Sequence, residues 1–170
     1  MSKSRSTVKE TLNSSEAQQQ IRVCGWARSV RRGKDVAFIA LNDGSCQDSL
    51  QIVVAASLLQ APAMASLGTG ACVAAQGNLV ASPAAGQSWE LQADQLEMLG
   101  GVDAGYPLQK KRHSFEYLRS IAHLRPRANT FGAVFRMRSA LSFAVHQFFH
   151  ERGFLYVHTP IITTNDCEGA

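Results

Sequence analysis

The chain lacks the features of a membrane or exported protein. No apolar run approaches the ~20 residues that a helix needs to cross a bilayer. The N-terminus, MSKSRST, has charge but no apolar stretch behind it, which argues against a secretory signal and leaves a short organelle transit segment open. None of the four cysteines forms a CxxC pair, so we expect reduced, buried thiols. These absences predict a cytoplasmic protein without a membrane partner.

Catalytic and metal-binding motifs are also lacking. There is no nucleophile elbow, and Gly68-Thr69-Gly70 is not followed by the Lys-Ser/Thr of a phosphate loop. His146 and His150 have the i, i+4 spacing of zinc proteases, but Gln147 stands where the glutamate is needed and no third ligand is evident. We therefore expect no catalytic residue, no metal site and no bound cofactor in this chain.

Positive charge is absent from a long central stretch. Between Asp35 and Gln109 there is no Lys or Arg, whereas basic residues concentrate in residues 22–34 and 110–138. Clustered cations beside neutral or acidic surface suggest a polyanion bound along a track. A solvated charged face is an equally good interpretation from charge alone.

Alternation of apolar and polar residues predicts an all-β domain over residues 21–101. Residues 21–28, 36–41, 50–54, 71–80 and 88–99 read as strands, and residues 55–67 read as a helix interrupted near Pro62. Five strands with one helix between the third and fourth is the layout of an OB-fold barrel, whose strand face binds oligonucleotides. Residues 1–20 are polar and predict a mobile tail or a weak helix.

The remaining residues predict a connector and a helix. Residues 102–127 are basic and punctuated by prolines, and residues 130–152 carry an apolar stripe at helical spacing. Asn129 or Thr130 is a candidate cap at the start, Gly153 closes the end, and Phe154–Val157 read as a following strand. Left alone, this stripe would be an exposed apolar patch prone to association.

Strand alternation also predicts which side chains on the barrel surface could bind a ligand. If Ala37 and Ile39 face the interior, Phe38 points outward, where an aromatic ring can stack on a base. A domain contact or a solitary exposed ring is the alternative. The same alternation turns Gln51 and Glu90 outward, as donors and acceptors for a base edge. Three arginines near the end of the first strand are placed to meet phosphate or a base: Arg28, Arg31 and Arg32.

Several segments in order carry a family resemblance. CGWARSVRRG (residues 24–33) and FIALNDGS (residues 38–45) resemble the anticodon-binding barrel of the aspartyl, asparaginyl and lysyl class II aminoacyl-tRNA synthetases. YPLQKK (106–111), IAHLRPR (121–127) and TNDCEGA (164–170) look most like asparaginyl-tRNA synthetases. The segment GFLYVHTPII (153–162) is similar to the first class II signature motif, which forms the dimer interface.

The resemblance implies a role for each region. It implies that Phe38 stacks on the central anticodon base of tRNA(Asn), that Gln51 bonds that base, and that Glu90 helps to read the first base. It also implies that residues 102–127 form a hinge touching the tRNA, and that residues 128–170 begin an α+β catalytic domain with its first helix and strand. The dimer motif would include Gly153, Phe154 and Pro160 in a homodimeric parent enzyme. Glu168 matches a position near the amino-acid pocket.

The resemblance also implies what these 170 residues omit. The second and third class II motifs, which hold ATP and Mg²⁺ in the parent enzyme, have no counterpart here. We therefore expect the N-terminal part of an asparagine-activating ligase, with no aminoacylation by this chain alone. Two alternatives stay open: a stand-alone tRNA-binding OB module without catalysis, and part of an aspartyl-tRNA synthetase.

Overall fold

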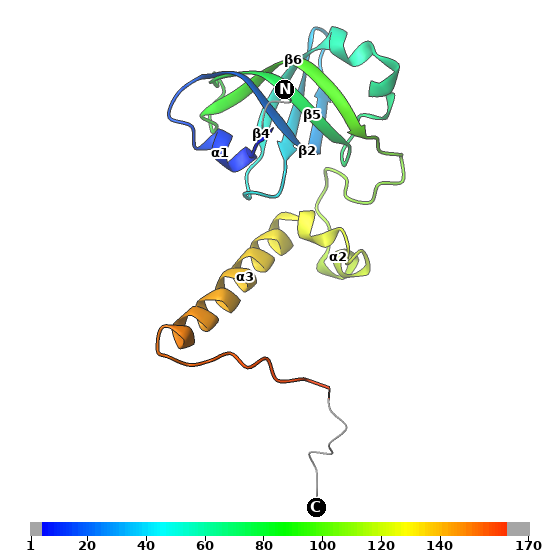
Figure 1. Ribbon diagram of the computed structural model, residues 1–170. Coiled ribbons are helices and arrows are strands. Elements are labelled where there is room, and N and C mark those ends of the chain that lie inside the picture. The colour runs from blue at the N-terminus through cyan, green and yellow to red at the C-terminus, as the bar shows by residue number, and fades with distance from the viewer. Residues whose placement is uncertain (1–4, 163–170) are drawn as a thin grey trace, which may run out of the picture.

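A computed structural model describes residues 5–162, which form a β-barrel followed by a mostly helical segment (Figure 1). The barrel strands are β2 (Gln18–Arg32), β3 (Val36–Asn42), β4 (Leu50–Ala55), β5 (Cys72–Ala81) and β6 (Trp89–Gly100). Strand β2 is long enough, at 15 residues, to pair with two neighbours.

Strand pairing closes the barrel. The order β2-β3-β4-β6-β5 returns to its start because β5 also pairs with β2. The β4–β6 pair is parallel, whereas β2–β3, β3–β4, β5–β6 and β2–β5 are antiparallel. A register shift between Ala27 and Ser29 separates the part of β2 that pairs with β5 from most of the part that pairs with β3. The predicted five-strand OB-fold barrel is confirmed.

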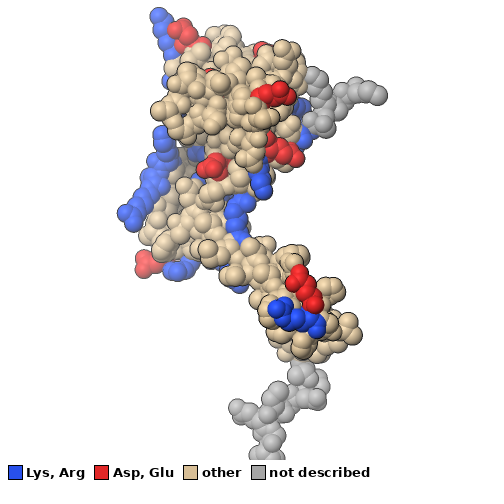
Figure 2. Space-filling model, turned by 90° about the vertical axis from the view of Figure 1, so that its left-hand side faces the viewer, with Lys and Arg blue, Asp and Glu red and all other residues tan. Residues whose placement is uncertain are grey.

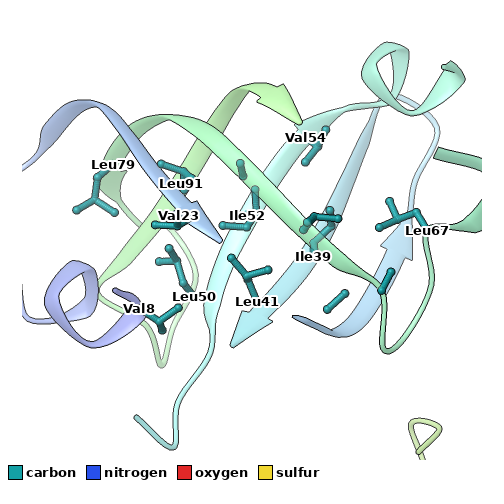
Figure 3. Close-up of a cluster of buried hydrophobic side chains, with 14 residues drawn as sticks. Val8, Val23, Ile39, Leu41, Leu50, Ile52, Val54, Leu67, Leu79 and Leu91 are labelled. Atoms are coloured by element: carbon teal, nitrogen blue, oxygen red, sulfur yellow. The ribbon is translucent and has the colours of Figure 1, made fainter. Parts of the chain in front are cut away.

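Alternating side chains from all five strands fill the barrel. Ile39, Ile52 and Leu91 are fully buried, as are Val23 and Leu79, and Figure 3 shows them converging on one another inside the closed sheet. Their sequence neighbours therefore point to the outer surface, since successive side chains of a strand face opposite sides.

The N-terminal segment differs from the predicted mobile tail. Residues Arg5–Ser6 form β1, which pairs in parallel with β2, and Val8–Leu12 form α1, which matches the weak-helix alternative. Thr7 and Glu10 form a capping box at the start of α1. The side chain of Val8 is fully buried in the barrel core. This buried side chain, together with hydrogen bonds from the backbone amides of Val8 to Asp43 and of Lys9 to Ser45, holds the segment against the barrel.

The helix predicted over residues 55–67 is not an α-helix. Two short 3₁₀ helices stand there instead, η1 (Ala56–Gln60) and η2 (Pro62–Ser66). Ala61, which precedes Pro62, is extended (φ −60°, ψ 136°), as expected of a residue before proline. This extended residue prevents a continuous helix.

The connector leads from β6 through α2 (Phe115–Ser120) and η3 (Arg125–Arg127) to α3 (Asn129–His150). In Figure 1, α3 extends away from the barrel, with residues 151–162 running on from its far end. The predicted caps Asn129 and Thr130 are wrong: Ala128 is the N-cap, and no side chain caps the helix. Gly153 has φ +82° and its N–H donates to the carbonyl of His150 at 3.0 Å, as predicted for a residue closing the helix.

The strand predicted over Phe154–Val157 is absent. Residues 154–160 have no regular secondary structure, and Leu155 is 88% exposed. Among the described residues no strand lies beside this segment, and an isolated strand cannot satisfy its backbone hydrogen bonds. Within residues 5–162, no helix is long and apolar enough to cross a membrane.

Candidate nucleic-acid interface

Strand register brings three of the predicted site residues together on the outer face of the barrel. On β4, Gln51 lies opposite Ala40 of β3 and opposite Glu90 of β6, and Phe38 lies one pleat further along β3, opposite Val53. Their sequence neighbours Ile39, Ile52 and Leu91 point into the core. One aromatic ring, one amide and one carboxylate therefore share a face, as strand alternation predicts.

A continuous series of contacts connects this face. The guanidinium of Arg31 lies 5.5 Å from the centroid of the Phe38 ring, and its Nη2 lies 3.5 Å from Oε1 of Gln51. Nε2 of Gln51 in turn donates to Oε2 of Glu90 at 3.2 Å. The amide of Gln51 is therefore oriented, with its oxygen toward the cation and its nitrogen toward the carboxylate. We call Arg31, Phe38, Gln51 and Glu90 the barrel face.

Glu90 is more enclosed than an outward-facing residue of a strand usually is. It is 6% exposed, although it points away from the barrel core. The connection between β5 and β6 supplies part of its surroundings, because Oγ of Ser82 donates to Oε2 of Glu90 at 3.1 Å. Buried carboxylates need such donors, since losing water without replacement is costly.

The other two predicted arginines lie elsewhere. Nη2 of Arg28 donates to Oδ1 of Asn129 at 2.6 Å, where the barrel meets the start of α3. Burial lowers the pKa of Arg28, a change opposed by Tyr106 and reinforced by Arg127. Nη2 of Arg32 donates to the backbone carbonyl of Leu67 at 3.2 Å. Of the three arginines, only Arg31 joins the contacts of the barrel face.

The connector is packed against the barrel through aromatic and arginine contacts. Arg127 lies 4.5 Å from the centroid of the Trp26 ring, and its Nη1 donates to the hydroxyl of Tyr106 at 3.3 Å. Tyr106 covers Gly70, where a Cβ atom would lie 2.6 Å from the Tyr106 ring and φ is +101°. A side chain at position 70 would displace that ring, so glycine is required for this close approach.

A basic cleft lies between the barrel and the connector. Its volume is about 990 Å³, and its walls include Arg28 and Ser29 from β2 and residues 108–115 from the connector. Lys110, Lys111 and Arg112 on this wall are exposed. In Figure 2, Lys and Arg side chains gather at the narrow waist below the barrel, whereas several acidic side chains lie on the barrel itself.

A second set of contacts ties α3 to the turn between β3 and β4. Arg136 donates to the backbone carbonyls of Gly44, Ser45 and Cys46, and Nε2 of Gln47 donates to the carbonyl of Asn129 at 2.8 Å. With the Arg28–Asn129 bond, these contacts form what we call the α3 joint. Sequence reasoning missed Arg136, because nothing in a helical arginine's neighbours indicates that it reaches across to a turn.

The predicted dimer-motif residues lie beyond α3 and away from the barrel. Phe154 is 61% exposed and its ring packs edge-on against Phe149 at 5.4 Å, while Pro160 is also exposed. Glu168 and Cys167 lie outside the described residues.

Metal-ligating side chains do not gather in the described part of the chain. Residues 5–162 contain no group of three or more His, Cys, Asp and Glu side chains that could hold an ion. The ring of His146 packs against Tyr156 at 4.8 Å, and Cys24, Cys46 and Cys72 are free thiols. Burial raises the pKa of Cys72, so that thiol is a poor nucleophile at neutral pH.

Comparison with known proteins gives one consistent family. Residues 21–99 match a family described as an OB-fold nucleic acid binding domain. The chain is 61% identical over 166 residues to the asparagine–tRNA ligase of Geotalea uraniireducens, covering 98% of this chain and 36% of that protein. It is 65% identical over 151 residues to the asparagine–tRNA ligase of Geobacter metallireducens, covering 89% and 33%.

Solved structures agree on the fold. Asparaginyl-tRNA synthetase from Pyrococcus horikoshii complexed with asparaginyl-adenylate matches with a TM-score of 0.79 at 22% identity, over 96% of this chain and 38% of that one. The chain thus spans about a third of the length of the curated relatives that it matches. These similarities show that the chain corresponds in sequence to the part of asparagine–tRNA ligases that contains the OB-fold domain.

Proposed function

We propose that the barrel face binds the anticodon loop of tRNA(Asn). The observation that carries this proposal is the contact series Arg31–Phe38, Arg31–Gln51 and Gln51–Glu90, which holds a stacking ring beside oriented hydrogen-bonding groups. Proteins read single-stranded RNA by stacking unpaired bases on aromatic rings and bonding their Watson–Crick edges. In this proposal Phe38 stacks on the central base, Gln51 bonds it, and Glu90 accepts from the first base.

The basic cleft has a supporting role in the same proposal. Exposed cations on its connector wall, Lys110, Lys111 and Arg112, would contact the phosphates of the tRNA between its anticodon arm and acceptor stem. Arg31 would supply a further cation next to the loop. Phosphate contacts give affinity without sequence information, so the cleft would add strength and the barrel face specificity.

A titration across a salt series tests this function. The 170-residue chain is titrated with an RNA hairpin carrying the asparagine anticodon, GUU, and with hairpins in which each anticodon base is replaced. We expect tighter binding of the matched hairpin, with a mismatch cost of ~1–3 kcal/mol per base, and affinity that falls as salt rises. Equal affinity for matched and mismatched hairpins would contradict the proposal.

The activity of the complete protein is inferred from its family. We infer that the whole protein acts in the cytoplasm as a homodimer, activates asparagine with ATP and Mg²⁺, and transfers it to tRNA(Asn). We assign no catalytic step to residues 5–162. We propose that a polypeptide of these 170 residues has no ligase activity, which ATP–pyrophosphate exchange with asparagine would test against a blank reaction.

Two other functions remain as alternatives to test. A stand-alone tRNA-binding module would share the barrel face, but the high identity extends through 89–98% of the chain, well beyond the barrel. An aspartyl-tRNA synthetase would share the reading of the first two bases, because the asparagine and aspartate anticodons differ only in the third. Preference for a GUC hairpin over GUU would favour the aspartyl alternative.

A further inference from the structure

The connection between β5 and β6 contains a hydroxyl whose hydrogen-bonding direction is fixed by its neighbours. Oγ of Ser82 accepts from Nε2 of Gln87 at 2.7 Å and from the backbone N–H of Ala84 at 3.2 Å. Both partners can only donate. A serine hydroxyl has two acceptor positions and one hydrogen, so with both acceptor positions filled its hydrogen is left for the third neighbour, Oε2 of Glu90 at 3.1 Å.

The same oxygen of Glu90 receives a second donor. Nε2 of Gln51 reaches Oε2 at 3.2 Å, and the oxygen of that amide faces Arg31, which fixes the amide's direction as well. Within residues 5–162, both side-chain hydrogen bonds to the carboxylate thus converge on Oε2. Oε1 accepts no side-chain hydrogen bond within residues 5–162 and is not a fully buried atom, so it accounts for solvent contact of a residue that is 6% exposed.

From this arrangement we infer that Ser82 is a positioning residue for base recognition, which selects the carboxylate oxygen of Glu90 that meets the RNA. The inference rests on the proposed function and deepens it. With Oε2 held by two donors, the carboxylate presents Oε1 as a single, directed acceptor. Guanine places two adjacent donors, N1–H and the N2 amino group, on its Watson–Crick edge and can pair with that oxygen through N1–H, whereas the N1 of adenine is unprotonated and can only accept.

Removal of the Ser82 hydroxyl would release the carboxylate. With Gln51 as its one remaining side-chain partner among residues 5–162, Glu90 could rotate about its terminal bonds, and either oxygen could face solvent. An acceptor that is no longer held in place loses conformational freedom when it binds, and this loss of entropy weakens binding. The loss of affinity should affect RNA with guanine at the first anticodon position, and not RNA whose first base makes no bond with Glu90. Discrimination between the two RNAs should therefore change more than general affinity.

The test uses the 170-residue chain and two RNA hairpins that differ only in the first anticodon base, guanine or adenine. For Ser82→Ala we expect the affinity ratio between the two hairpins to fall roughly threefold to tenfold, the effect of one hydrogen bond. Ser82→Thr, which keeps the hydroxyl, should retain the ratio. Ser88→Ala is the matched control, an exposed serine of the same connection. Gln87→Ala should give a smaller fall, because it frees one acceptor position of Ser82.

A second comparison separates positioning from folding. In a Glu90→Gln background, Ser82→Ala should change the ratio no further, because both substitutions act through one interaction. If Ser82→Ala weakens both hairpins equally and leaves the ratio unchanged, the inference is overturned while the proposed function stands. If the wild-type chain does not distinguish the two hairpins, both are overturned.

Discussion

Arg28 and Asn129 are joined by a 2.6 Å hydrogen bond between Nη2 and Oδ1 that spans the boundary between barrel and helix. Arg28 belongs to β2 and Asn129 is the first residue of α3, so the bond fixes the helix start against the barrel wall. The carbonyl of Asn129 also accepts from Gln47. One residue of α3 is thus held through its side chain and through its backbone.

Replacement of Arg28 should loosen the start of α3. For Arg28→Ala we expect a loss of about 1.5–3 kcal/mol in the free energy of unfolding, the range for a hydrogen bond made by a charged group. Urea denaturation measures it, with Lys34→Ala, an exposed cation after β2, as the control. A fall in the salt dependence of RNA binding for Arg28→Ala, with stability unchanged, would assign this arginine to phosphate instead.

Arg136 should control how firmly α3 is attached. Its guanidinium reaches the carbonyls of Gly44, Ser45 and Cys46, which have few other donors in the turn. For Arg136→Gln we expect faster amide exchange at the N-terminal end of α3, with barrel strands unchanged, because local opening needs fewer broken bonds. Arg138→Gln, on the same helix, serves as the control. Equal exchange in both variants would show that the joint does not depend on Arg136.

Asp43 should make the N-terminal segment sensitive to acid. Burial raises the pKa of Asp43, but hydrogen bonds from Ser45, the amide of Val8 and Arg5 outweigh it, so the pKa lies below its usual 3.8. A lowered carboxylate pKa stabilises the fold above the unfolded-state pKa, and that contribution is lost as pH falls through the folded value. The stabilisation contributed by the Asp43 carboxylate should therefore be lost below about pH 4.

Asp43→Asn provides the measurement. At pH 7 we expect the variant to unfold with about 1–3 kcal/mol less free energy than the wild type, because a charged acceptor of several bonds is lost. The difference should shrink as pH falls below about 4 and the wild-type carboxylate becomes protonated. Asp48→Asn, an exposed residue near the same turn, is the control. A difference that stays constant with pH would exclude the carboxylate as its source.

Phe38 and Arg31 should contribute to RNA binding in different ways. Phe38→Ala should weaken the matched hairpin by ~1–3 kcal/mol at every salt concentration, because stacking does not release counterions. Arg31→Ala should instead reduce the slope of affinity against salt by about one ion if its guanidinium meets phosphate. Phe38→Tyr keeps an aromatic surface and is the control. No change in either variant would remove the barrel face from the RNA interface.

Much of the barrel could be predicted from sequence because each strand carries its own period. Strand alternation identified the buried Ile39 and Ile52, and therefore the outward Phe38 and Gln51, without any tertiary information. The N-terminal segment could not be predicted in the same way. Val8 inserts into the core and Leu12 packs against it, but α1 is only five residues long, and two apolar residues in a polar stretch are too few to establish a helical period.

The hydrogen-bond partners of the three arginines could not be predicted from the sequence. Arg28, Arg31 and Arg32 lie within a stretch of five residues but bond to three different partners. The reasons are the register shift between Ala27 and Ser29 and the length of the arginine side chain. Ser82 was missed for a related reason. Its hydroxyl gains a direction only when Gln87, Ala84 and Glu90 surround it, and that arrangement exists only in the folded loop.

The exposed side of α3 should make the 170-residue chain self-associate. Met137, Leu141 and Val145 are 67%, 59% and 55% exposed and recur at helical spacing on one face of α3, and contiguous exposed apolar surface favours contact with another apolar surface. We expect the average mass in sedimentation equilibrium to rise with concentration, and Leu141→Glu to shift the chain toward monomer, because a carboxylate is costly to bury. Leu99→Glu, a 48% exposed leucine on β6, should leave association unchanged. A wild-type chain that stays monomeric, or equal effects of the two variants, would show that α3 does not provide the contact.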